Sequence, residues 1–123
     1  MQLDNSRPIW AQLVDEFRRN IAAGRWGPGQ KLPPVRELAL ELGVNPNTVQ
    51  KSLSEVDRLG LTTTERTSGR FVTRDEALIS AARAALATTT ADSFISAAHG
   101  LGMSLDEAAR LVRDRWQLGK DSQ

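Results

Sequence analysis

Residues 43–51, GVNPNTVQK, decide the fold that the sequence predicts. The stretch holds a glycine, a proline and two asparagines, yet apolar residues at helical spacing continue on both sides of it. Asn45 suits a helix N-cap, because its side-chain oxygen can accept an N–H from the next turn. Pro46 then takes the first helical position, where its missing N–H is harmless. The stretch therefore predicts a turn and the start of a new helix.

Two short helices are predicted on either side of this turn. Residues 34–42 carry apolar side chains at helical spacing and end at Gly43. The helix that begins after Asn45 buries a second stripe, formed by Val49, Ser52, Leu53, Val56 and Leu59. Two short helices joined by a turn that contains glycine form the helix-turn-helix pattern.

The segments further out complete a domain. Residues 8–23 predict a helix with Pro8 at its first position, and a loop rich in glycine and proline follows over residues 24–34. Residues 61–73 are rich in threonine, have a glycine near their centre and predict a two-stranded hairpin. We therefore expect a mainly α fold with a small β-hairpin, in which residues 1–74 form a winged helix-turn-helix DNA-binding domain.

Residues 75–123 predict three short helices that form a dimerisation and effector region. Capping boxes at Thr73/Glu76 and Ser104/Glu107 start two of them, and the run TTTAD at 88–92 is expected to interrupt the helix. Helices of about 10–13 residues are marginal alone. A second copy of the chain would cover their apolar faces, and the expected interface residues are Leu78, Phe94, Leu105, Val112 and Trp116.

Outward-facing polar side chains predict a DNA surface. Asparagine and glutamine can each form two hydrogen bonds with adenine, and lysine and arginine reach guanine or phosphate. Arginines on a wing lie along the minor groove or the backbone. The simpler interpretations are a solvated capped helix and surface ion pairs of little energetic value. The expected contact residues are Arg36, Asn47, Thr48, Gln50, Lys51, Arg66, Gly69 and Arg70.

Composition limits the other classes of function. The chain has 123 residues, 40% of them hydrophobic and 25% charged, which is the mix of an ordinary globular protein. Net charge is +3 over residues 1–74 and −2 over the rest, so the first part is mildly basic. There is no cysteine and only one histidine, His99. We expect no metal, no cofactor, no catalytic site, no membrane segment and a cytoplasmic location.

Four segments resemble the GntR family of bacterial transcriptional regulators: PIWAQL at 8–13, IAAG at 21–24, PGQKLPPVRELALELGVNPNTVQKSL at 28–53 and GRFV at 69–72. The VNPNTVQK sequence and the short C-terminal region are similar to the YtrA subfamily. That resemblance implies a short dimeric regulator, often encoded beside ABC-transporter genes. It also implies that Arg36 is the helix-two arginine that contacts DNA and that Gly69 is the wing glycine.

Three departures from the family pattern bear on these expectations. Pro34 stands where many relatives have a capping serine, and residues 67–70 read TSGR where many have G-x-G-T. Pro46 and Gln50 stand where other relatives have arginines, so the operator preference of those relatives does not transfer.

The expected function is that of a homodimeric repressor on an inverted-repeat operator in double-stranded DNA, with adjacent transporter genes as candidate targets. A small-molecule effector between the C-terminal helices would supply induction, although no polar cluster identifies it. The alternative is a winged helix that serves as an interaction scaffold without DNA, which the weak net charge favours.

Overall fold

The computed structural model describes residues 2–121. The chain forms two compact units, Met1–Leu86 and Ala87–Gln123. The functional boundary predicted after residue 74 stays a prediction. No helix in the described part of the chain has the length and apolar character to span a membrane.

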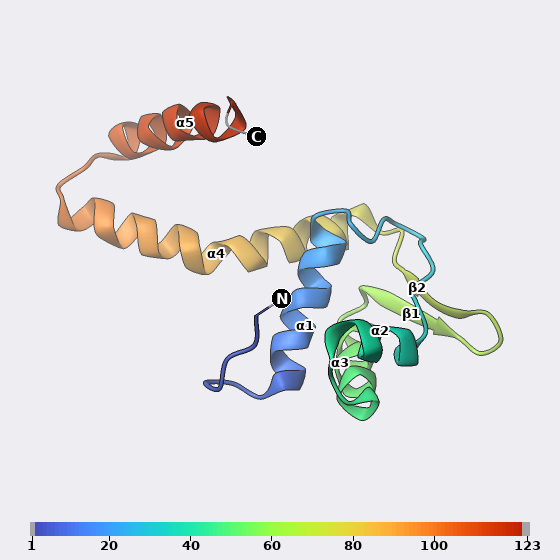
Figure 1. Cartoon of the computed structure of the whole chain (residues 1–123). Coiled ribbons are helices and arrows are strands. Elements are labelled where there is room, and N and C mark those ends of the chain that lie inside the picture. The colour runs from blue at the N-terminus through green and yellow to red at the C-terminus, as the bar shows by residue number, and fades with distance from the viewer. Residues whose placement is uncertain (1, 122–123) are drawn as a thin grey trace. The chain divides into compact units, whose positions relative to one another are not determined.

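The first unit begins with three helices: α1 (Ile9–Ala22), α2 (Val35–Leu42) and α3 (Pro46–Arg58). α3 contacts both of the others and the hairpin that follows (Figure 1). The predicted helix-turn-helix is confirmed, with Gly43 at a φ of 66° ending α2. Pro8 is the residue before α1 rather than its first helical residue, because its ψ of 142° is extended.

The hairpin consists of β1 (Thr62–Glu65) and β2 (Gly69–Val72), which pair antiparallel with Thr62 opposite Val72. The loop before α2 pairs with β2. The Leu32 N–H donates to the Arg70 carbonyl at 2.8 Å, and Lys31 forms a β-bridge with Phe71. Helices α1–α3 followed by this hairpin form a winged helix-turn-helix, so the predicted mainly α fold with a small hairpin is confirmed.

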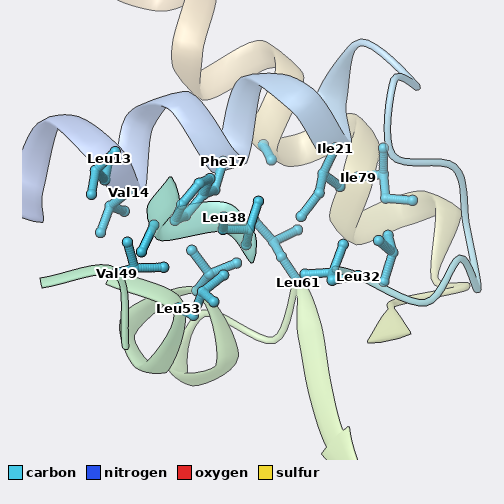
Figure 2. Packing of buried hydrophobic residues seen from close by; sticks show 14 residues of the cluster. Leu13, Val14, Phe17, Ile21, Leu32, Leu38, Val49, Leu53, Leu61 and Ile79 are labelled. Carbon is cyan, nitrogen blue, oxygen red and sulfur yellow. The ribbon is translucent and has the colours of Figure 1, made fainter. Parts of the chain in front are cut away.

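The core of the first unit lies between α1 and α3. Figure 2 shows the α1 side chains Leu13, Phe17 and Ile21 directed toward the side chains of α2 and α3. The start of α4 (Glu76–Gly100) adds Ile79. The most buried large side chains of this core are Phe17, Leu13, Ile21, Leu53, Val49 and Val56.

The cap of α3 is built as the sequence predicts. The Asn45 Oδ1 accepts the Asn47 N–H at 2.8 Å, and Pro46 occupies the first helical turn. α2 has no side-chain cap at Pro34, as expected from the missing serine. Asn45 is therefore the side chain that starts the helix on which the predicted contacts lie.

Replacing Asn45 with alanine is expected to lower the free energy of unfolding by about 1 kcal/mol, because an N–H of the first turn loses its acceptor. Urea denaturation followed by circular dichroism measures this loss. Asn45→Ser keeps an acceptor and should stay within a few tenths of a kcal/mol of the unmodified chain. Equal losses in the two variants would contradict the capping role.

Two expectations for the C-terminal helices are wrong. α4 runs without interruption from Glu76 to Gly100, through residues 88–92. Asp75, not Thr73, caps it, since the Asp75 Oδ1 accepts the N–H groups of Ala77 and Leu78 at 3.0 and 3.3 Å. The second unit ends with α5 (Leu105–Asp121). Its predicted cap is confirmed, because the Ser104 hydroxyl accepts the Glu107 N–H at 3.1 Å.

Candidate nucleic-acid interface

The first turns of α3 present polar side chains to solvent. Asn47, Gln50 and Lys51 are exposed and Thr48 is half-buried. On the other face of the helix, Val49 and Leu53 have no exposed surface. The helix is therefore held by one face while the opposite face is open, which is the arrangement that lets a helix enter a major groove.

A buried hydroxyl anchors this helix to α1. The Ser52 Oγ donates to the Trp10 carbonyl at 2.9 Å and lies at the same distance from the Thr48 carbonyl. Ser52 has no exposed surface, so this hydrogen bond is shielded from water. It fixes the position of α3 along α1.

Two of the predicted contact residues have intramolecular partners on the open face. The Lys51 ammonium lies 4.5 Å from the centroid of the Trp10 ring, within cation–π range. The Gln50 Nε2 donates to the Ser54 Oγ at 3.1 Å. Both side chains are thus ordered at the surface. The contribution of Trp10 was not predicted, because its position on an apolar stripe indicates core packing.

Arg36 lies exposed on α2. Among the described residues its guanidinium makes no ion pair. It borders an apolar groove of about 530 Å³ whose other lining residues are Ala39, Leu40, Gly43, Val44 and Pro46. The groove places Arg36 beside Pro46, at the start of α3. Its predicted DNA contact stays a prediction.

The wing, residues 62–72, holds the remaining predicted contacts. Arg66 is exposed near the tip, and Gly69 has a φ of 111°. Arg70, predicted as a DNA contact, forms an ion pair, because its Nη2 lies 3.1 Å from the Asp57 Oδ2. Asp57 belongs to α3, so this pair links the wing to the helix.

A cleft of about 450 Å³ separates the wing from the beginnings of α2 and α3. It brings together Gln50, Gly69 and Arg70, which are distant in sequence. Lys31 also lines it, and its Cε would lie 2.9 Å from a Cβ added at Gly69. The sequence did not single out Lys31. Its position shortly before Pro33 and Pro34 was the one sequence feature that could have indicated a surface role. Its pairing with Phe71 is visible only in the fold.

The predicted dimer residues differ in exposure. Trp116 and Leu105 are 73% and 83% exposed, and Val112 is 44% exposed. Phe94 is half-buried. Leu78 is 38% exposed and belongs to the first unit, where it lies beside Gly60. Across residues 2–121, no three side chains of His, Asp or Glu gather as metal ligands would.

The sequence and the fold have known counterparts. The bacterial regulatory proteins of the gntR family match residues 10–72. The HTH-type transcriptional regulator YhcF of Bacillus subtilis is 33% identical over 106 residues, which cover 86% of this chain and 88% of that protein. The HTH-type transcriptional repressor YtrA of Bacillus subtilis is 38% identical over 77 residues, 61% of this chain and 59% of that protein.

Solved structures of transcriptional regulators are also similar to this chain. A GntR family transcriptional regulator from Listeria monocytogenes superposes with a TM-score of 0.77 at 32% identity, over 91% of this chain and 98% of that one. AraR(DBD), solved in complex with operator ORR3, matches 59% of this chain and 88% of its own with a TM-score of 0.53 at 29% identity. These relatives are regulators, which confirms the expectation of a regulator rather than an enzyme.

Proposed function

Since the chain belongs to the GntR family and is a transcriptional regulator with a DNA-binding domain, we propose that it is a homodimeric repressor acting on an inverted-repeat operator. The observation that carries this proposal is the open polar face of α3, held in place by Val49, Ser52 and Leu53 on its buried side. Such a face has the shape and the donors and acceptors to read base edges in a major groove.

The proposed contacts fall into two classes. Asn47 and Gln50 read bases, because amide side chains offer a donor and an acceptor together. The other contact residues bind phosphates or the minor groove beside the wing. They set the affinity for DNA rather than the preference for a sequence. This second group consists of Arg36, Thr48, Lys51, Arg66 and Gly69, to which we add Lys31 for its place in the cleft, while Arg70, which pairs with Asp57, holds the wing.

The proposed dimer rests on the second unit. Leu105 and Trp116 of α5 expose most of their side-chain surface, as does Leu101. Large apolar side chains gathered on one short segment are typical of an interface. In a dimer, two α3 helices would enter successive major grooves about one helical turn apart.

Regulation follows from this arrangement. A bound repressor excludes polymerase from a promoter, and a cytoplasmic location follows from its DNA target. A small-molecule effector that changes the spacing of the two DNA-binding units would release the operator, since a ligand acts by binding one state better. Control of adjacent transporter genes belongs to the same proposal and rests on the resemblance to YtrA.

Fluorescence anisotropy with DNA from upstream of the chain's own gene tests the proposal, with a shuffled duplex beside it and two salt concentrations. We expect binding to the native DNA to be tighter by about 10³ and to weaken with salt. Weak, equal binding to both duplexes directs the search to other DNA through selection from a random duplex library. Failure to select any sequence would contradict the proposal and favour the scaffold.

Replacing Lys51 with alanine is expected to weaken binding to every duplex by a similar factor and to lower the slope of log affinity against log salt by about 1, because one phosphate contact is lost. Anisotropy titrations over a salt series measure both quantities. Lys120→Ala makes the same chemical change at an exposed site on α5 and should leave the slope unchanged. A loss confined to one DNA sequence would assign Lys51 to base reading instead.

A further inference from the structure

Asp57, in the last turn of α3, collects hydrogen bonds from both strands of the wing. The Arg70 Nε donates to its Oδ1 at 3.2 Å and the Arg70 Nη2 to its Oδ2 at 3.1 Å. The Thr64 hydroxyl donates to Oδ2 at 2.8 Å, and the Thr62 hydroxyl donates to Oδ1. We call these four residues, Asp57, Thr62, Thr64 and Arg70, the wing clamp. It joins β1 and β2 to the helix that carries the proposed base contacts.

The arginine at the centre of the clamp is sheltered. The Arg70 side chain is 12% exposed and that of Asp57 is 26% exposed. In the other ion pairs among the described residues, the arginine is 23–68% exposed. Sheltered pairs are screened less by salt and hold a more definite geometry than pairs in open water. The guanidinium also uses two nitrogens on one carboxylate, which fixes its orientation.

We propose that Asp57 is a positioning residue for DNA binding, which holds the wing at a fixed separation from the recognition helix α3. The inference rests on the proposed function. A two-stranded hairpin is marginal by itself, so its direction depends on what holds it. Backbone bonds from residues 29–32 attach β2 on one side, including Val72 N–H to the Gln30 carbonyl at 2.9 Å. Asp57 supplies the attachment on the other side.

Asp57→Asn separates two effects of opposite sign. The change removes a negative charge beside the proposed DNA surface, which alone would strengthen DNA binding. It also removes the carboxylate that Arg70, Thr62 and Thr64 share, which releases the wing and weakens binding. We expect the second effect to win, with an affinity loss on the order of tenfold, the size of one or two lost phosphate contacts.

Glu55→Gln is the matched control on the same helix. Glu55 pairs with Arg58 within α3 and does not join the wing. The hydrogen bond from Arg58 lowers the pKa of the Glu55 carboxyl, so the control removes a full negative charge at neutral pH. It should bind DNA as tightly as the unmodified chain or within about twofold tighter.

The experiment uses the full chain and the duplex that the unmodified chain selects from a random library. Anisotropy gives affinity, hydroxyl-radical footprinting gives backbone protection at the wing, and dimethyl sulfate footprinting gives protection of guanine N7 in the major groove. We expect Asp57→Asn to lose the wing protection, keep the base preference and keep its unfolding midpoint close to that of Glu55→Gln. Asp57→Glu should recover part of the lost affinity.

A double variant provides the second readout. Asp57→Asn with Arg70→Gln should bind about as weakly as either single variant, because both changes break one clamp. If the affinity losses of the two single variants add in the double variant, the inference is overturned. It is also overturned if the Asp57→Asn variant binds DNA as tightly as the Glu55→Gln variant. Loss of major-groove protection together with the wing protection would also overturn it and indicate a general structural role. If the unmodified chain selects no sequence, the proposed function itself fails.

Discussion

Replacing Trp116 with glutamate is expected to convert the proposed dimer to a monomer and to lower operator affinity by about 10²–10⁴. The indole is 73% exposed in the single chain, and burying a charge in its place within an apolar interface is strongly unfavourable. Two linked DNA-binding units gain this factor because the second binds at a high effective concentration once the first is bound.

Sedimentation velocity measures the oligomeric state, and anisotropy on the selected operator measures affinity. Gln117→Glu introduces the same side chain at the neighbouring exposed position of α5 and should leave both quantities nearly unchanged. A Trp116→Glu variant that stays dimeric would place the interface elsewhere. A monomeric unmodified chain with tight operator binding would contradict the dimer altogether.

Leu53→Ala is expected to lower the free energy of unfolding by about 2–5 kcal/mol. Leu53 has no exposed surface and lies in the core between α1 and α3 (Figure 2). The shorter side chain leaves a cavity that the surrounding helices fill only in part, and the cost depends on how far they relax.

Urea denaturation at one fixed protein concentration measures the loss, because the stability of a dimer depends on concentration. Leu40→Ala deletes the same atoms from a side chain that is 84% exposed, and should stay within about 0.5 kcal/mol of the unmodified chain. Equal losses at the two positions would contradict the placement of the core.

The helix-turn-helix was predictable because its determinants are local. Asn45, Pro46 and Gly43 each act on the adjacent turn of backbone, so their effect can be inferred from the sequence alone. The buried stripe of α3 was predictable for the same reason, since its period is that of the helix. Val49, Leu53 and Val56 are all without exposed surface, whereas Leu59, predicted in the same stripe, lies just after the last helical residue and is 37% exposed.

The interruption predicted at residues 88–92 does not occur, because threonine disfavours a helix only weakly. Residues 88–92 contain three threonines and an aspartate, which favour caps and turns, but neither glycine nor proline. In a helix, threonine costs at most about 0.7 kcal/mol relative to alanine. The alanines on both sides favour the helix, so it continues. Asp75 displaced Thr73 as the cap because it lies next to the first helical residue.

The site was less predictable than the fold, because its important contacts join residues far apart in sequence. Arg70 was identified as a cation facing DNA, yet the fold brings it to Asp57. Lys31 reaches the wing only because residues 29–32 pair with β2. Trp10 meets Lys51 only because α1 packs on α3. Helical and strand periods carry no signal for such pairs.

The contact between Lys51 and Trp10 affects the entropy of association. A free lysine side chain carries about 2 kcal/mol of rotamer entropy, and much of it is lost when the ammonium docks on a phosphate. Here the ring already holds the ammonium 4.5 Å from its centroid in the absence of DNA. Part of that ordering therefore occurs during folding, so the proposed DNA surface is partly preorganised and has less freedom left to lose on binding.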